Sequence, residues 1–444
     1  MLTKSSGLFV GLVAMLLSMS VFAGDPVAPL AWHGVTDIAA GRGERGPWRQ
    51  NQSKFDYVDD PSVAIDDAGE IAVAWVDQVR KDIFFQRLSP DGARKPSQPL
   101  NVSRNPMTFS WLPRVVVGPD SMQNIYILWQ EIIFSGGSHG GDIFFARSLD
   151  GGATFSQPVN LSKSVGGDGK GRINPKVWHN GSLDLIGGAN GDLYAAWTEY
   201  DGPLWFSRST DAGATFSRPQ RVARGSGKPA RAPTLAVQGS HTVYLAWTSG
   251  EDNSADIRVA KSIDGGRTFG APRVVAPSKG YSDAPKLAVG PDKTLHLVYA
   301  ESAGGPFERY HIRYTRSKDG ARTFDAPRNI SQPAPKSVAS AGFPALSVDG
   351  QGKLYVMWEL FRDHRERPRG LGMVVSYDGG RRFTPPAAVP GSADPAGGMN
   401  GSHQGLLMKK LAVNRAGAVA IVNSSMKENE RSRVWLMRAG DGAP

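Results

Sequence analysis

RSLDGGATFSQP, residues Arg147 to Pro158, decides the fold because the chain repeats it. Its complete copies are RSTDAGATFSRP from Arg208, KSIDGGRTFGAP from Lys261, RSKDGARTFDAP from Arg316 and VSYDGGRRFTPP from Val375, and a degenerate copy, RLSPDGARKPSQP, starts at Arg87. The Asp accepts hydrogen bonds from backbone amides and the following glycines allow positive φ, so each copy predicts a tight turn. Its Phe is expected to anchor the turn between neighbouring sheets. We call the five complete copies the repeat turns.

The spacing of the copies predicts the architecture. Their Asp residues are 53 to 61 residues apart, at Asp91, Asp150, Asp211, Asp264, Asp319 and Asp378. Each period holds two apolar segments before the turn: the first begins at Pro61, Pro113, Pro175, Pro233, Pro285 or Pro344, and the second ends at Trp75, Trp129, Trp197, Trp247, Tyr299 or Trp358. Short segments of this kind, repeated at this period, predict the four-stranded antiparallel blades of a β-propeller.

The C-terminal tail adds one more unit. Segments 410–414, 418–422 and 433–437 have the pattern of the first three strands of a blade, with no repeat turn after them. Three strands leave an open edge, and Leu30 to Ile38 is expected to return as the fourth strand and close the ring. We therefore predict an all-β, seven-bladed β-propeller, with six blades as the alternative.

The repeat turns resemble the Asp-box, or BNR repeat, of the sialidase-like β-propeller superfamily, whose pattern is Ser-x-Asp-x-Gly-x-Thr-Phe. The resemblance covers nearly all of the chain after its N-terminal segment. It implies a propeller more specifically than an activity, because lectins, assembly factors and other glycosidases also contain Asp-boxes. Sialidases have six-bladed catalytic domains and an early Arg-Ile-Pro motif. That motif is absent here, and the nearest string is Leu112-Pro113-Arg114-Val115.

The N-terminus predicts export. Residues 1–23 combine Lys4, an apolar run from Leu8 to Leu17 and Val21-Phe22-Ala23 before Gly24, which is typical of a cleaved signal peptide. We expect an irregular segment with the ring-closing strand at 24–57 and the propeller at 58–444. The mature protein is expected to be secreted or periplasmic, with no transmembrane anchor.

Composition narrows the chemistry. The chain has no cysteine, which excludes disulfides and thiolate chemistry, and its eight histidines are dispersed without metal-ligand spacing, so no metal or cofactor is expected. The formal charge of +10 becomes +9 when Lys4 is removed (10 − 1), which favours an acidic glycan as partner. Nucleic acid is not expected, because the basic residues are scattered over all repeats.

Candidate site residues recur just after the aromatic residue that ends each second segment, namely Asp77, Glu131, Glu199, Glu301 and Glu359. Three of these carboxylates are expected to face a cation on the neighbouring strand: Arg114 with Glu131, Lys176 with Glu199, and Lys286 with Glu301. Such pairs are either structural or part of a ligand ring at the channel mouth. The catalytic candidates are Glu131, Glu199, Tyr200, Glu301 and Tyr310, and the ligand-binding candidates are Arg114, Lys176, Arg231, Lys286, Arg309 and Arg362.

Three classes of function remain open. The sequence favours a sialidase-like propeller that recognises a glycan, expected to be anionic, at the channel mouth, opposite the repeat turns. An active exo-sialidase, which the resemblance implies, is the first alternative. A polysaccharide lyase, with His179 and Tyr200 as candidates, and a non-catalytic envelope scaffold are the others. Whether the protein is an enzyme is therefore left open.

Overall fold

The computed structural model describes residues 30–46, 54–105, 107–118, 122–132, 141–163, 171–174, 177–179, 183–199, 202–224, 227–277, 280–306, 308–332, 334, 337–401 and 408–441, with 171–174 and 177–179 as backbone alone. Within these ranges the regular secondary structure consists of β-strands, apart from one 3-10 turn at Ala189–Gly191. No helix among them is long and apolar enough to cross a membrane.

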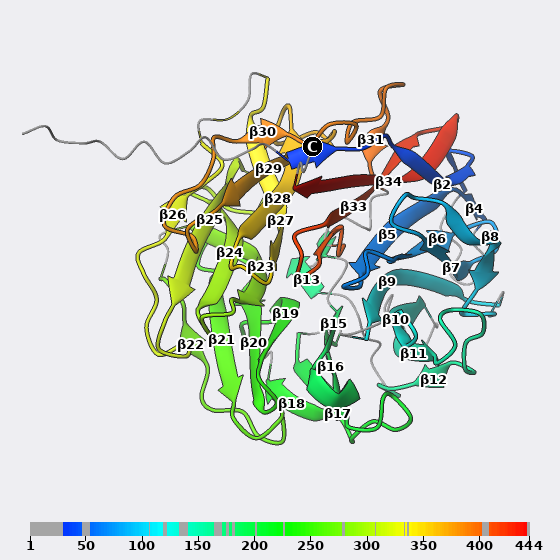
Figure 1. The fold of residues 1–444 in the computed structure, drawn as a ribbon. Coiled ribbons are helices and arrows are strands. Elements are labelled where there is room, and N and C mark those ends of the chain that lie inside the picture. The colour runs from blue at the N-terminus through cyan, green and yellow to red at the C-terminus, as the bar shows by residue number, and fades with distance from the viewer. Residues whose placement is uncertain are drawn as a thin grey trace, which may run out of the picture.

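Seven four-stranded antiparallel blades form a closed ring, which confirms the predicted seven-bladed propeller and excludes the six-bladed alternative (Figure 1). The strands of the first six blades run outward from the channel in chain order. Blade 1 consists of β5 (Val58–Ile65), β6 (Ile71–Asp77), β7 (Asp82–Leu88) and β8 (Arg94–Asn101); blade 2 of β9 (Phe109–Val117), β10 (Ile125–Ile132), β11 (Asp142–Ser148) and β12 (Val159–Asn160); and blade 3 of β15 (Leu183–Gly187), β16 (Leu193–Thr198), β17 (Leu204–Ser209) and β18 (Gln220–Ala223). Blade 4 consists of β19 (Ala230–Gln238), β20 (Thr242–Ser249), β21 (Asp256–Ser262) and β22 (Arg273–Val274); blade 5 of β23 (Tyr281–Val289), β24 (Leu295–Ser302), β25 (Tyr310–Ser317) and β26 (Arg328–Asn329); and blade 6 of β27 (Ser340–Val348), β28 (Leu354–Phe361), β29 (Leu371–Ser376) and β30 (Ala387–Ala388).

Blade 7 joins the two ends of the chain. Its inner strands are β32 (Leu411–Val413), β33 (Val419–Lys427) and β34 (Arg431–Asp441). The outer edge of β34 pairs with β1 (Leu30–Trp32) and β2 (Thr36–Gly41), so the fourth strand of this blade comes from the N-terminal segment. Three short strands complete the described elements: β3 (Glu44–Arg45) and β4 (Phe55–Asp56) pair with each other, and β31 (Met399–Asn400) pairs with β33.

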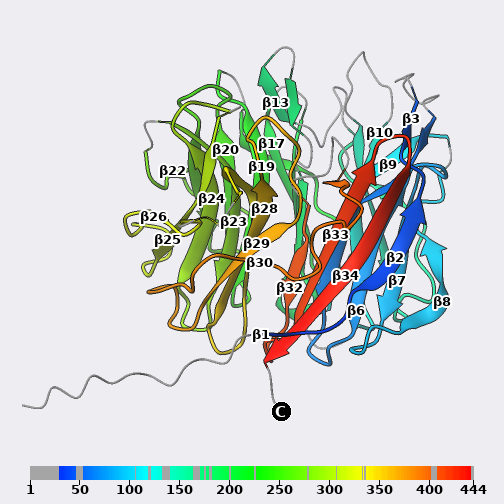
Figure 2. The ribbon, with the colours of Figure 1, turned by 90° about the horizontal axis from the view of Figure 1, so that it is seen from above.

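Blade 3 departs from the sequence prediction. Its innermost strand is β15, whereas Pro175 was expected to start that strand. The chain around Pro175 instead belongs to an inserted hairpin of β13 (Gly171–Asn174) and β14 (Val177–His179), which forms its own two-stranded sheet. Figure 2 shows β13 above the ring, at the end opposite the tip of β34. We call the hairpin's end of the ring the loop side and the other end, which carries the repeat turns, the turn side.

The repeat turns have one hydrogen-bond pattern. In the first, Asp150 accepts bonds from the Ser148 hydroxyl (2.7 Å), the Thr154 backbone N–H (2.9 Å) and the Thr154 hydroxyl (2.6 Å). The same three bonds form around Asp211, Asp264 and Asp319. At Asp378 the Thr position is occupied by Arg382, whose Nε lies 3.3 Å from the carboxylate. The turn carboxylates therefore satisfy backbone and side-chain donors within their own turns.

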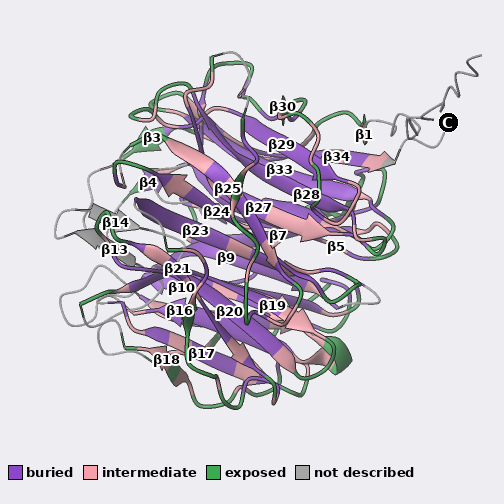
Figure 3. Ribbon diagram, turned by 90° about the vertical axis from the view of Figure 1, so that its left-hand side faces the viewer, coloured by how far each residue is buried: buried purple, intermediate pink, exposed green. Residues whose placement is uncertain are grey.

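Each repeat turn also joins its blade to a neighbour. Arg147 donates to the backbone oxygen of Ala212 in the next turn (2.8 Å), and Arg208 and Arg316 make the corresponding bonds. The turn's Phe packs edge-on against an aromatic residue of the preceding blade, as between Phe155 and Phe85 at 5.2 Å between ring centroids. Figure 3 shows that buried residues follow the central strands, where apolar blade faces pack against each other.

Candidate functional site

A bulge shapes the innermost strand of most blades near the loop side. In each such strand the residue before the proline has positive φ. These residues are Asp60, Leu112, Ala232, Ala284 and Phe343. The register of the strand with its neighbour shifts at this point in all five blades. Non-glycine residues rarely adopt this conformation, so its recurrence at the same position in five blades marks the bulge as a regular feature of the channel wall.

The strand register separates the cations from the carboxylates with which they were predicted to pair. Arg114 lies opposite Leu128, whereas Glu131 lies opposite Ser110. In blade 5, Lys286 lies opposite Val298, and Glu301 instead binds Arg313 on β25 at 2.6 Å. The predicted pairing is therefore wrong for these two blades: each carboxylate lies three positions along its strand from the residue that faces the cation, more than the one-residue shift of the bulge. The third predicted pair involves Lys176, which lies outside the described residues.

Glu131 is buried among hydrogen-bond donors. Its side chain is 1% exposed and accepts hydrogen bonds from the hydroxyls of Thr108 and Ser110 (2.7 Å) and from Trp129 Nε1 (2.8 Å). Burial raises the pKa of Glu131 to about 7, although the three hydrogen bonds act in the opposite direction. A carboxyl group that titrates near neutral pH is suited to proton transfer, but here it is enclosed.

A second group brings together Arg231 and Tyr310 with residues that the sequence analysis missed. Arg231 is buried, donates through Nε and Nη2 to the Gly250 carbonyl (3.1 and 2.9 Å), and places Nη1 3.6 Å from Asp283. Its guanidinium lies over the ring of Tyr281, 5.4 Å from the centroid. The rings of Tyr281 and Tyr310 meet edge-on at 6.2 Å. The group lies between blades 4 and 5 at the loop-side end of their inner strands.

The environment keeps both phenols of this group protonated. Burial, followed by the charge of Asp283, raises the pKa of Tyr281. Burial, followed by Tyr281 and Asp283, raises the pKa of Tyr310, whose hydroxyl donates to the Pro306 carbonyl at 2.8 Å. Nη1 of Arg231 is buried without a hydrogen-bond acceptor among the residues that the structure covers. The arrangement thus offers a guanidinium donor beside two proton-donating phenols.

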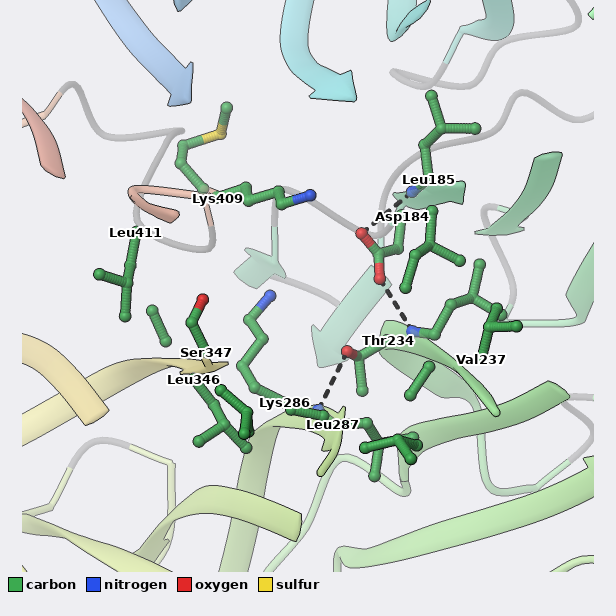
Figure 4. A pocket seen from close by; sticks show the side chains of 18 residues that line it. Asp184, Leu185, Thr234, Val237, Lys286, Leu287, Leu346, Ser347, Lys409 and Leu411 are labelled. Atoms are coloured by element: carbon green, nitrogen blue, oxygen red, sulfur yellow. Dashed lines mark hydrogen bonds between the residues drawn. The ribbon is translucent and has the colours of Figure 1, made fainter. Parts of the chain in front are cut away.

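Two of the other predicted cations, Arg114 and Lys286, lie in the channel. Arg114 is 1% exposed and donates to the sulfur of Met408 at 3.3 Å. Lys286 lines a channel cavity together with Lys409 and Asp184, which the sequence analysis did not single out. Figure 4 shows these two lysines and Asp184 from three different parts of the chain around one space. Aligning the innermost strands in register would have found Asp184, but the inserted hairpin of blade 3 conceals that register.

The remaining candidates do not gather at one point. Arg309 and Arg362 are exposed, and Glu199 is half-buried in the turn after β16. Tyr200 lies outside the described residues, and so does the side chain of His179. Glu359 is buried and forms an ion pair with Lys410 of blade 7 at 2.6 Å. No group of three or more metal-ligating side chains occurs in the part of the chain that the structure describes.

The comparisons with known proteins identify the fold. No protein-family model matches the chain, and no curated protein matches its sequence significantly. Among solved structures, the polysaccharide lyase Uly1 has a TM-score of 0.55 at 12% identity, covering 93% of this chain and 100% of that one. A PL25 ulvan lyase bound to -[GlcA(1-4)Rha3S]- has a TM-score of 0.52 at 12% identity, covering 91% and 95%. A NanB sialidase from Streptococcus pneumoniae reaches 0.47 at 9% identity, covering 73% and 67%. At such identities the likeness shows that the chain shares the β-propeller fold with glycan-active proteins.

Proposed function

We propose that this protein is an exported, sialidase-like Asp-box propeller that recognises an anionic glycan at the loop-side mouth of its channel. The observation that carries the proposal is Arg231: Nε and Nη2 donate to the Gly250 carbonyl, whereas Nη1 has an ion-pair contact with Asp283 at 3.6 Å but no hydrogen-bond acceptor among the described residues. A ligand carboxylate or sulfate would supply that acceptor, because a planar guanidinium suits such oxyanions.

Two further features support the proposal. The repeat turns match the Asp-box pattern and form the same hydrogen bonds in four blades, and the net charge of +10 favours acidic partners. Tyr281 and Tyr310 add aromatic surface beside the guanidinium, which is the composition of small-molecule sites: mainly apolar and aromatic walls with few polar groups.

A β-eliminating polysaccharide lyase is the second candidate function. The seven-bladed ring and its likeness to ulvan lyases over more than nine-tenths of the chain favour it at the level of fold. In such a reaction a base removes the proton on the carbon next to the uronate carboxylate, a C=C bond forms, and the glycosidic oxygen leaves with a proton. Arg231 would neutralise the carboxylate, and the protonated phenol of Tyr310 would supply the proton to the leaving oxygen. Asp283, the carboxylate beside Arg231, already binds Arg231 and Thr248, so recognition without turnover is the first proposal.

Three assays on the purified mature protein test these functions together. A glycan array with carboxylated glycans and their carboxyl-reduced counterparts measures recognition, a fluorogenic sialoside measures hydrolysis, and ultraviolet absorbance of unsaturated uronate products measures elimination. Selective binding of the carboxylated forms is expected. Binding to none of these glycans, with no turnover, would overturn glycan recognition and favour a scaffold.

Variants connect the activity to the group. Arg231→Lys keeps the charge but loses the planar donor pair, and we expect at least a tenfold loss of binding. Arg322→Lys, on an exposed repeat turn, is the matched control and should bind as the wild type does. Tyr310→Phe removes only a hydroxyl, so it keeps the test valid if Arg231→Lys does not fold. Unchanged binding in both site variants would contradict the assignment of the site.

A further inference from the structure

The turn-side half of the channel contains a charged chamber that is separate from the Arg231 group. It has a volume of about 280 Å³ and is lined by the inner strands β15, β19, β23 and β27 and by the segment Met408–Leu411. Three of its wall residues, Val237, Val289 and Val348, also line a wider hollow of about 730 Å³ at the turn-side mouth. A small solute can therefore approach the chamber from the turn side.

The chamber contains more positive than negative charge. Lys286 and Lys409 extend into it from different walls, and their ammonium groups and the Asp184 carboxylate point toward the same space (Figure 4). Arg114 is buried close enough to interact electrostatically with Asp184 and with both lysines. The two lysines and Asp184 leave an excess of one positive charge if all three are ionised (2 − 1 = 1).

Asp184 is the one carboxylate among the described residues that line the chamber. One of its oxygens accepts the Leu185 backbone N–H at 3.0 Å, and the other accepts the Leu235 backbone N–H of blade 4 at 2.8 Å. Neither lysine ammonium has a hydrogen bond or an ion pair with any residue in the described part of the chain. Both lysines are half-buried. Two ammonium groups that face one cavity beside a single carboxylate raise the positive potential there and favour an anionic ligand.

The pKa shifts of the two lysines agree with a site that lacks negative charge. Burial lowers the pKa of Lys286 to about 8; Asp184 counteracts this shift, whereas Arg114 and Lys409 add to it. Burial also lowers the pKa of Lys409. A nearby carboxyl group, Asp60, does not remove the excess, because burial and the adjacent Asp59 raise the pKa of Asp60 well above its usual range. A bound anion would relieve the repulsion among the cations.

We propose that this chamber binds a small oxyanion between Lys286 and Lys409, with Arg114 contributing long-range attraction. The ligand class is sulfate, phosphate or the carboxylate of a single acidic sugar, because the cavity is smaller than those that hold drug-sized ligands. This site does not depend on glycan recognition at the loop side. It lies on the other side of the bulged segment of the inner strands and uses different residues.

Calorimetric titration in chloride buffer of constant ionic strength tests the proposal, with inorganic sulfate, inorganic phosphate and glucuronate as three separate ligands. Saturable binding of at least one is expected. Binding of sulfate or phosphate alone identifies a free oxyanion as the source, and binding of glucuronate alone identifies an acidic sugar. Saturable binding of none of the three would overturn the proposal.

Lysine variants locate the binding. We expect Lys286→Met to raise the dissociation constant at least tenfold, and the double variant Lys286→Met/Lys409→Met to abolish binding. Lys318→Met makes the same charge change on an exposed repeat turn and should leave the affinity unchanged. Circular dichroism confirms folding, and Lys409→Met alone serves if the double variant does not fold. Equal affinity in the wild type and the chamber variants would place the anion elsewhere and refute the site.

Discussion

The repeat turns keep the same residue types from blade to blade, whereas equivalent positions of the channel wall do not. In four blades the Thr hydroxyl binds the turn Asp at 2.6 Å, and the residue types are the same. On the channel wall, the residue opposite the position before each closing aromatic differs from blade to blade: Ser62, Arg114, Asp184, Thr234, Lys286 and Ala345.

The channel positions themselves fall into two kinds. Ser62, Asp184 and Thr234 each accept a backbone N–H from the next blade, at 3.1, 2.8 and 3.4 Å, so short acceptors at this position connect blades. Arg114 and Lys286 have no acceptor to offer a backbone N–H, and they introduce charge instead. Repetition thus marks the scaffold, and departure from it at a structurally equivalent position marks the residues that can bind a ligand.

This comparison also explains what the sequence predicted. The repeat turns depend on interactions within a few residues, so their pattern predicted the four-stranded blades. The strand pattern of the tail, which has no repeat turn, predicted the seventh blade and its closure by the segment around Leu30. The channel contacts depend on strand register, which the bulges shift and the blade 3 insertion hides. Lys176 was predicted where Asp184 lines the channel, because the insertion hides the register of blade 3. Glu301 was paired with Lys286, but it lies three positions from the residue that faces Lys286 and binds Arg313 instead.

The largest expected effect is on the scaffold. Phe155 is 8% exposed and packs on Phe85 of the preceding blade, so Phe155→Ala should lower the free energy of unfolding by about 3–5 kcal/mol. Urea unfolding monitored by circular dichroism measures the loss. Phe155→Leu fills most of the volume and should lose less than half as much. Anion binding in the channel should be unchanged in Phe155→Leu, and a loss below about 1 kcal/mol in Phe155→Ala would mean that the turn does not anchor the blade.

A smaller loss is expected when a turn carboxylate is removed. Asp211→Ala breaks bonds with Ser209 and Thr215, which should lower the free energy of unfolding by about 2 kcal/mol near neutral pH. The Thr215 hydroxyl and backbone N–H, followed by Ser209, lower the pKa of Asp211 to about 2. Because the folded-state pKa lies below the unfolded value, this stabilisation is present above about pH 4 and is lost as the pH falls toward 2.

Urea midpoints at pH 6 and pH 3 test this linkage. The difference between the wild type and Asp211→Ala should shrink at pH 3, and Asp211→Asn, which keeps one acceptor oxygen, should lie between them. A difference that stays constant from pH 6 to pH 3 would show that the turn is not stabilised by the ionised carboxylate.

The channel should respond in the opposite direction. Lys286→Met removes one of three clustered cations while Arg114 and Lys409 still face Asp184, so it should raise the free energy of unfolding by about 1 kcal/mol at pH 7. The folded-state pKa of Lys286, about 8, lies below the unfolded value, so the wild type gains stability as the pH rises from about 8 to 10. The advantage of the variant should disappear over that window. Urea unfolding in anion-free chloride buffer measures it, and destabilisation at pH 7 would show that Lys286 is structural.

The smallest effect is expected at Glu131, a repeated residue type in an unusual environment. Its pKa of about 7 lies above the unfolded value of about 4.3, so the stability it contributes is present below about pH 4 and is lost as the pH rises through 7. Glu131→Gln should change the free energy of unfolding by less than about 1 kcal/mol at pH 4, because the amide keeps the shape and an acceptor for Trp129. Its stability should then decline less than that of the wild type between pH 4 and 7. Ser110→Ala removes a donor to the carboxylate and should shift the decline to higher pH. Parallel stability curves for the wild type and Glu131→Gln from pH 4 to 7 would show that folding does not raise the pKa of Glu131.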